Sequence, residues 1–262
     1  MLLTIDVGNT QTVLGLYQEG SAVNAADAGL VDNWRIRTDH DRTPDEHAVL
    51  IGSLLRPSNR DLESTVTGVA ICAGVPQVLA SLRAMIVRYA DLEPVVIEPG
   101  VKTGMPILYD NPKEVGADRI ANAVGAYDLY GGPTVVVDFG TGNNFDVISA
   151  EGEFLGGAIA PGVEVSLDAL FGRASALRAV DLVEPRSVIG KSTVESLQSG
   201  AVYGFAAQVD GMVDRFRNEL GGCTVVATGG LAHLIVPSTS SVEHVEPFLT
   251  LHGLRLVHER NR

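Results

Sequence analysis

The residues best suited to chemistry lie in two similar segments, one beginning at Asp6 and the other at Asp138. In each segment an apolar run contains an aspartate, glycine and small hydroxyl or amide residues follow, and a second apolar run comes next. This pattern predicts a strand, a tight turn and a second strand. Backbone N–H groups in such a turn can approach an anion closely, and the aspartate can hold a cation bound to that anion. Two such turns facing each other would clamp a polyphosphate and its metal.

A single turn of this kind is weak evidence, because aspartate–glycine turns are common in β-rich chains. Two copies, each opening one half of a 262-residue chain, strengthen the phosphate-binding interpretation. A chain of this length can form two medium-sized halves, each with its own core.

A third candidate is the segment 116–119, which reads Gly-Ala-Asp-Arg and is expected to open a helix that continues through Tyr127. Asp118 could be a capping carboxylate of that helix. Alternatively, it could accept a proton from a substrate hydroxyl that attacks a phosphoryl group, while Arg119 binds a substrate carboxylate. The residues by themselves leave both interpretations open.

Two glycine-containing segments invite a nucleotide interpretation. Gly229 and Gly230 end an expected strand, and this corner could seat a flat ring or a phosphate, or could simply make a tight turn. The segment 190–193 reads Gly-Lys-Ser-Thr like the end of a P-loop, but Pro185 stands where the upstream glycine is required. We therefore interpret that segment as a helix start capped by Ser192 or Thr193.

Strands and helices alternate in both halves. In the first half we expect a hairpin, a strand over 31–37, a helix after Thr43, a strand over 66–70, a helix opened by Pro76 and a strand over 95–97. In the second half we expect strands over 135–137, 145–148, 154–159 and 224–227, a long helix over about 192–220 and a short helix from Leu231. This alternation predicts a mixed sheet with helices packed on it in each half.

Composition narrows the class of protein. A net charge of −13 argues against nucleic acid or an anionic membrane as the main partner. No basic region precedes the first apolar run, which Asp6 interrupts, and no run approaches 18 apolar residues, so we expect a cytoplasmic protein. Cys72 and Cys223 lie in apolar runs and are expected to be buried thiols, and the six histidines show no metal-ligand spacing.

Taken together, these segments resemble the type III pantothenate kinases, members of the acetate kinase, sugar kinase, Hsp70 and actin superfamily. The resemblance spans nearly the whole chain and rests on segments 6–10, 34–38, 110–112, 116–119, 137–141, 156–162, 193–200 and 227–230. It implies an α/β fold with two ribonuclease H-like (actin-like ATPase) domains, each a mixed β-sheet with flanking helices, and a cleft between them. We expect the domains to span residues 1–115 and 116–262.

The resemblance implies transfer of the γ-phosphate of ATP to the terminal hydroxyl of pantothenate, an early step of coenzyme A biosynthesis. Asp118 would be the proton acceptor. Asp6 would lie near the Mg²⁺ that accompanies ATP, and Asp138 would bind a monovalent cation, K⁺ or NH₄⁺. ATP would be held by Asp6, Val7, Gly8, Asn9, Thr10, Gln11, Thr12, Val13 and Thr141. Pantothenate would be contacted by Tyr109, Gly116, Ala117, Asp118, Arg119 and, from the other subunit of a homodimer, Thr193.

The second turn departs from the family pattern. After its threonine the family usually has alanine and two more threonines, whereas this chain has Gly142, Asn143 and Asn144. Asparagine keeps hydrogen-bonding capacity but changes the side-chain length and lacks the hydroxyl. This departure leaves two alternatives open: a catalytically weak, kinase-like protein that binds a ligand in a regulatory or accessory role, and a kinase for another small hydroxylated substrate.

Overall fold

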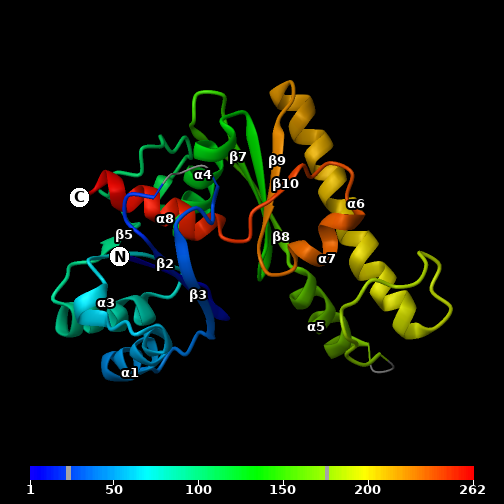
Figure 1. The fold of residues 1–262 in the computed structure, drawn as a ribbon. Coiled ribbons are helices and arrows are strands. Elements are labelled where there is room, and N and C mark those ends of the chain that lie inside the picture. The colour runs from blue at the N-terminus through cyan, green and yellow to red at the C-terminus, as the bar shows by residue number, and fades with distance from the viewer. Residues whose placement is uncertain (22–24, 175–176) are drawn as a thin grey trace. The chain divides into compact units, whose positions relative to one another are not determined.

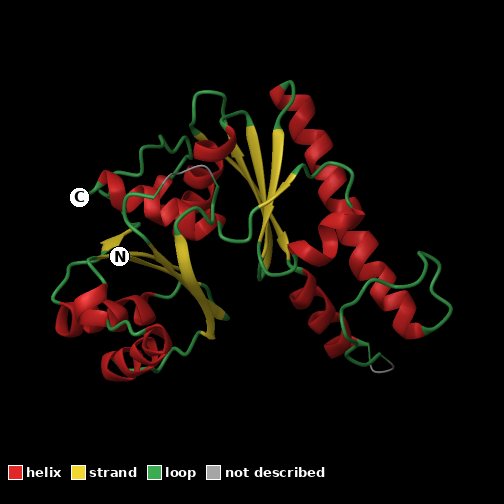
Figure 2. Cartoon of the chain, viewed as in Figure 1, coloured by secondary structure: helices red, strands yellow, loops and turns green. Residues whose placement is uncertain are grey.

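The computed structural model describes residues 1–21, 25–174 and 177–262 of the protein. These residues form two compact units, Met1–Leu129 with Phe248–Arg262, and Tyr130–Pro247. Each unit contains one five-stranded sheet with helices packed against it (Figures 1 and 2). The predicted α/β class with two mixed sheets is therefore confirmed.

The first unit is built around a sheet with the strand order β3-β2-β1-β4-β5. Its strands are β1 (Leu2–Val7), β2 (Gln11–Tyr17), β3 (Leu30–Arg37), β4 (Gly68–Ala73) and β5 (Val95–Val96). Its helices are α1 (Pro44–Leu55), α2 (Leu62–Thr65), α3 (Pro76–Ala90), α4 (Ala117–Tyr130) and α8 (Leu249–Arg260), with short 3₁₀-helices at Arg56–Ser58 and Pro112–Glu114. Strand β1 is antiparallel to β2 and parallel to β4.

The second unit repeats this design with the strand order β10-β9-β6-β7-β8. Its strands are β6 (Thr134–Phe139), β7 (Gly142–Ile148), β8 (Phe154–Pro161), β9 (Thr224–Thr228) and β10 (His244–Val245). Its helices are α5 (Val163–Arg173), α6 (Thr193–Leu220) and α7 (Ala232–Ile235), with a 3₁₀-helix at Val236–Ser238. Strand β6 is antiparallel to β7 and parallel to β9, as β1 is to β2 and β4. The repeat in the sequence is thus a repeat of topology.

Alternation along β1 separates the two faces of the first sheet. Leu3, Ile5 and Val7 pack with apolar side chains of α1 and α3 in one core cluster. Thr4 and Asp6 belong to the opposite face, where α8 packs against β1 and β4. Figure 1 shows α1 and α3 on one side of this sheet and α8 on the other. The face that carries Asp6 is therefore the face covered by α8.

Helix α8 has no counterpart among the predicted elements. Three polar side chains, His252, Arg255 and His258, interrupt its apolar pattern, although all three are buried. The helix also contacts α4 closely, because a side chain at Gly253 would lie 1.9 Å from the carbonyl oxygen of Ala121. Such backbone contact requires glycine. Because these polar residues break the apolar pattern, this helix was not predicted from the sequence, although it packs against β1 and β4 of the first unit.

Most other predicted elements lie within a few residues of their expected limits. The expected strand over 66–70 begins and ends later, as β4, because its pairing with β1 continues to Ala73. Thr43 caps α1 in a capping box with Glu46, and Ser192 caps α6 through the backbone N–H of Glu195, as predicted. Both cysteines are free; Cys72 is buried, as expected, whereas Cys223 is only half-buried.

The expected domain boundary at residues 115 and 116 stays a prediction. Compactness groups most of α4, together with α8, with the first sheet, whereas the expected boundary places α4 in the second domain. Compact units and the domains of a fold family need not coincide. Among the described residues, no helix combines the length and the apolar character needed to cross a bilayer.

His47 in α1 is a buried imidazole, and neither ring nitrogen has a hydrogen-bond partner in the part of the chain that the structure describes. Burial, and then the charge of Arg42, lower its pKa from 6.5 to about 4, against the smaller opposing effects of Asp39 and Glu46. The folded protein therefore binds this proton less readily than the unfolded chain does.

We predict that this imidazole makes the protein less stable as the pH falls from 7 to 5. Over that interval the unfolded chain takes up the proton and the folded protein does not. This difference lowers the free energy of unfolding by about 2 kcal/mol. Urea unfolding at both pH values measures the loss, and His47→Leu should remove that share of it. An equal loss of stability in the parent and the variant would contradict the prediction.

Candidate active site

The turn between β1 and β2 follows Asp6 and faces solvent. Its backbone is closed by the N–H of Gly8, which donates to the carbonyl oxygen of Gln11 at 3.0 Å. Asn9, Thr10 and Gln11 are exposed, whereas Asp6 is half-buried. The turn thus places exposed residues beside a carboxylate, which is an arrangement that suits a phosphate and its cation.

Thr38, just after β3, holds this turn in place. Its backbone N–H donates to the carbonyl oxygen of Thr10 at 2.9 Å, and its hydroxyl donates to the carbonyl oxygen of Gly8 at 2.7 Å. The Thr38 hydroxyl also lies 2.9 Å from that of Thr12, and both threonines are buried. Sequence reasoning gave Thr38 no role, although it lies in one of the segments on which the family resemblance rests.

Asp6 contacts one buried thiol, on which the charge of Asp118 also acts. The parallel pairing of β1 with β4 places Cys72 opposite Asp6, and its Sγ donates to Oδ1 of Asp6 at 3.2 Å. Burial, and then the charges of Asp6 and Asp118, raise the pKa of Cys72 well above its usual range, so the thiol is protonated at neutral pH. The charges of two carboxylates far apart in the sequence therefore act on the same side chain.

Asp118 lies in the first turn of α4. Its Oδ1 accepts a hydrogen bond from the backbone N–H of Arg119 at 2.9 Å, so the carboxylate also satisfies a donor at the helix start. The side chain of Asp118 is half-buried, and Arg119 is 6% exposed. Tyr109 is half-buried in the loop that leads to this helix. The capping and chemical interpretations of Asp118 are therefore compatible.

The turn between β6 and β7 is a shorter version of the first. Asp138 lies in β6 as Asp6 lies in β1, and the N–H of Gly140 donates to the carbonyl oxygen of Gly142 at 3.1 Å. Thr141 is exposed at the tip, and its carbonyl oxygen accepts from the N–H of Gly162 at 3.0 Å. The second turn is thus braced by the end of β8.

The Gly229 corner after β9 lies against Asp138. A side chain at Gly229 would come within 2.5 Å of Oδ1 of Asp138 and 2.6 Å of the backbone nitrogen of Phe139. The backbone of Gly229 also has a φ of +94°, which favours glycine. Close approach to the carboxylate therefore explains this glycine, and the corner belongs to the same site as Asp138.

The two asparagines of the second turn have different surroundings. Asn144 pairs with Asp138 and Asn143 with Phe139, and residues directly opposite each other share a face of the sheet. Asn143 is buried, and its Nδ2 donates to Oε1 of Gln208 in α6 at 3.2 Å. The departure from the family pattern therefore affects the Asp138 face through Asn144, while Asn143 connects the turn to α6.

Thr193 is the first residue of α6 and is exposed, directly after the capping Ser192. Glu195 accepts from the backbone N–H of Lys191 at 3.0 Å and pairs with Arg186. Side chains of the helix start itself therefore accept hydrogen bonds from its backbone N–H groups. The segment 190–193 is a capped helix start and not a phosphate loop.

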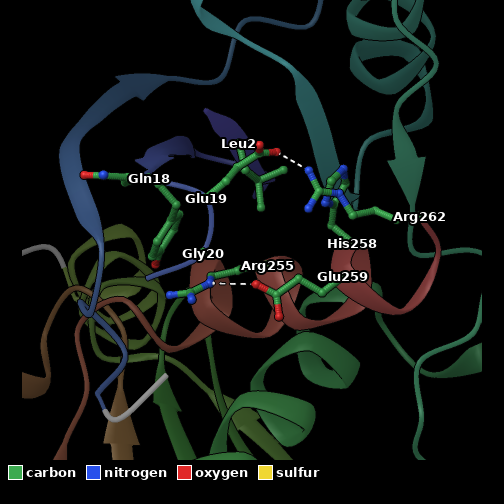
Figure 3. A pocket seen from close by; sticks show the side chains of 9 residues that line it. Leu2, Gln18, Glu19, Gly20, Arg255, His258, Glu259 and Arg262 are labelled. Carbon is green, nitrogen blue, oxygen red and sulfur yellow. Dashed lines mark hydrogen bonds and ion pairs between the residues drawn. The ribbon is translucent and has the colours of Figure 1, made fainter. Parts of the chain in front are cut away.

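A pocket at the opposite end of the β1–β2 hairpin is a weaker candidate (Figure 3). Arg255 there pairs with Glu259 and donates to the carbonyl oxygen of Ala28, and Arg262 pairs with Glu19. Because protein acceptors already pair with both guanidinium groups, this pocket is poorly suited to a triphosphate.

The oxygen atoms at Asp6 and at Asp138 suit cations that are bound partly by the protein and partly by a phosphate. Within the described ranges, no group of three or more histidine, cysteine, aspartate or glutamate side chains could hold a metal ion. Mg²⁺ in phosphoryl-transfer sites usually takes one or two carboxylates and fills its shell with phosphate oxygens and water, so Asp6 beside an exposed turn fits it. Asp138 and Asn144 offer oxygen atoms of the kind that bind a monovalent cation.

Comparison with solved structures agrees with the fold. The activator of the 2-hydroxyisocaproyl-CoA dehydratase from Clostridium difficile, solved with bound ADPNP, matches with a TM-score of 0.56 at 14% identity. The match covers 98% of this chain and 92% of that one. A likeness at this identity supports the two-sheet architecture and nothing finer.

Comparison of sequences is more specific. The family model described as type III pantothenate kinase matches residues 2–215. The type III pantothenate kinase of Frankia alni is 56% identical, with 100% of both chains covered. That of Streptomyces griseus is 55% identical, with 100% of this chain and 98% of the relative covered. The predicted resemblance is confirmed: this chain belongs to the type III pantothenate kinase family.

Proposed function

We propose that this protein transfers the γ-phosphoryl group of ATP to the terminal hydroxyl of pantothenate, the first step of coenzyme A biosynthesis. Identity of about 55% to type III pantothenate kinases over the full chain supports this assignment. One structural observation carries the mechanism: Asp6 is hydrogen-bonded to the buried thiol of Cys72, and the charge of Asp118 acts on the same thiol. A carboxylate that serves the nucleotide and one that serves the alcohol must lie near each other in such a reaction.

In the proposed step, Asp118 accepts the hydroxyl proton of pantothenate. The hydroxyl oxygen forms a bond to the γ-phosphorus while the bond from that phosphorus to the bridging oxygen breaks, and ADP leaves. Arg119 binds the pantothenate carboxylate, which a guanidinium group matches with two parallel hydrogen bonds. Gly116, Ala117 and Tyr109 complete the contacts to this substrate.

The nucleotide phosphates are assigned to the first turn. Asn9 and Thr10 are exposed there and Gly8 is half-buried, and Thr38 fixes the conformation of the turn through the hydrogen bonds described above. A turn already held in one conformation binds an anion without further loss of backbone entropy. Asp6 would hold the Mg²⁺ that accompanies ATP, and this ion would supply positive charge at the transferring group.

The second unit is assigned the monovalent cation and a further ATP contact. Asp138 holds K⁺ or NH₄⁺, which offsets phosphate charge, and Thr141 contacts ATP from the exposed tip of the turn. The side-chain amide of Asn144, opposite Asp138, can supply an oxygen to the same cation.

The active form is proposed to be a cytoplasmic homodimer in which Thr193 reaches pantothenate bound to the other subunit. Large apolar side chains of the second unit are exposed on β8 and around the start of α6, which supports a contact surface there. They are Ile159, Val188, Ile189 and Val194. Such residues are normally covered in an assembled protein.

The alternative of a catalytically weak, ligand-binding relative is less well supported. This alternative rested on the altered second turn. One of the two asparagines there, Asn143, points away from the Asp138 face and is hydrogen-bonded to α6. Asp6, Asp118, Arg119 and Asp138 are all present. The chain therefore keeps the groups that the reaction needs.

The direct test of the function is formation of phosphopantothenate from ATP, Mg²⁺, K⁺ and pantothenate. Asp118→Asn should lower kcat by about 100- to 10,000-fold, the usual range for loss of a general base, with little change in nucleotide affinity. Glu93→Gln, at an exposed carboxylate outside the segments assigned to the substrates, is the control and should leave kcat unchanged. No product from the parent protein, or full activity of Asp118→Asn, would refute the proposal.

The role of the first turn predicts a separate effect at Thr38. Thr38→Val removes the hydroxyl that bonds Gly8 and Thr12, so the turn loosens and the KM for ATP should rise by about tenfold. The KM for pantothenate should stay the same. Thr4→Val, which removes a buried hydroxyl that donates to the carbonyl oxygen of Gly15 in the same hairpin but away from the turn, is the comparison. An equal rise in KM for both substrates would count against the assignment.

The monovalent cation predicts a dependence on salt identity. At constant ionic strength, K⁺ or NH₄⁺ should support a rate several-fold higher than Na⁺ alone, and Asp138→Asn should abolish the difference. Because ionic strength is held constant, general screening cannot produce the effect. The same rate in all three salts would exclude a specific cation role for Asp138.

A further inference from the structure

Cys72 is a buried polar contact in an otherwise apolar strand. Its neighbours in β4, Val69, Ala70 and Ile71, are fully buried hydrophobic residues, and Cys72 itself has no exposed surface. Its thiol nevertheless donates to Oδ1 of Asp6 at 3.2 Å. A cysteine that only filled space would need no acceptor, because it can pack as a small hydrophobic residue.

The geometry of the sheet fixes this contact. Asp6 and Cys72 are partners in the parallel pairing of β1 with β4, so their Cα atoms are held in register by the ladder on both sides. The thiol therefore reaches the carboxylate from the neighbouring strand, on rigid elements. A donor held in this way selects one orientation of the Asp6 side chain.

A thiol is also a chemically suitable donor to the Asp6 carboxylate. The thiol lies beside a carboxylate that needs a donor which leaves its negative charge intact. An arginine or lysine there would neutralise Asp6, whereas a neutral thiol orients the carboxylate and leaves its charge for a cation. A hydroxyl group would also orient the carboxylate and leave its charge intact. It would form a stronger hydrogen bond through a smaller donor atom.

We propose that Cys72 is a positioning residue of the phosphoryl-transfer site, which holds Asp6 in the orientation that serves the metal-bound phosphates of ATP. The inference rests on the proposed function of Asp6. It adds that the orientation of Asp6 depends on a residue in β4 that lies outside the turn and outside α4.

The test compares four variants: Cys72→Ala, Cys72→Ser, Asp6→Asn, and Cys72→Ala combined with Asp6→Asn. Cys223→Ala, at a half-buried free cysteine of the second unit, is the matched control. For each variant, calorimetry gives the affinity for an ATP analogue with Mg²⁺, kinetics give KM for both substrates, and thermal unfolding gives stability.

Cys72→Ala should weaken binding of the Mg²⁺–nucleotide and raise the KM for ATP by about tenfold, the size expected for a hydrogen bond to a charged group. The KM for pantothenate should not change, and Cys72→Ser should restore most of the loss. In the double variant, removal of the thiol should add nothing to the effect of Asp6→Asn, because it acts only through that carboxylate.

Additive losses in the double variant, or equal changes in KM for both substrates, would show that Cys72 supports only packing and would overturn the inference. A change in unfolding temperature alone would do the same. If Asp6→Asn has no effect on nucleotide binding or activity, the proposed function of Asp6 fails instead. An effect of Asp6→Asn with none of Cys72→Ala leaves the function intact and refutes the positioning role.

Discussion

The parallel pairing of β1 with β4 is the constraint on which the candidate active site depends. It sets Asp6 opposite Cys72, and the charge of Asp118 at the start of α4 also acts on this thiol. The first hairpin supplies Asp6 and the turn. The neighbouring strand β4 and helix α4, which comes later in the chain, supply the other groups around the Asp6 carboxylate. A shift of one residue in this pairing would turn the Cys72 side chain to the other face of the sheet.

The second unit uses the same strand order for a related but different site. Its central strand also ends in an aspartate followed by a glycine turn, yet the turn is shorter and is braced by Gly162 instead of a threonine. In the register position that Cys72 has opposite Asp6, the second sheet has Thr228 opposite Asp138, and Gly229 also lies against that carboxylate. Duplication preserved the framework, while the groups around each carboxylate diverged, which fits different cations at the two places.

Much of this could be predicted from the sequence, because turn residues, caps and apolar periodicity act locally. The strands around both turns, the capping residues Thr43 and Ser192, and the helix that begins beside Asp118 all follow from short-range rules. Helix α8 could not be predicted, since its buried polar residues find their partners only in the folded unit. The contact of Cys72 with Asp6 could not be predicted either, because it depends on the register of two strands, β1 and β4, that are separated in the chain by two other strands and two α-helices.

The most direct measurement is a crystal structure of the protein with a non-hydrolysable ATP analogue, Mg²⁺ and pantothenate. The account predicts that the phosphates lie against the backbone of residues 8–10, with the metal near Asp6. It also predicts that the terminal hydroxyl of pantothenate lies within hydrogen-bonding distance of Asp118. Phosphates bound elsewhere, for example at Arg255, or a pantothenate hydroxyl remote from Asp118, would contradict it.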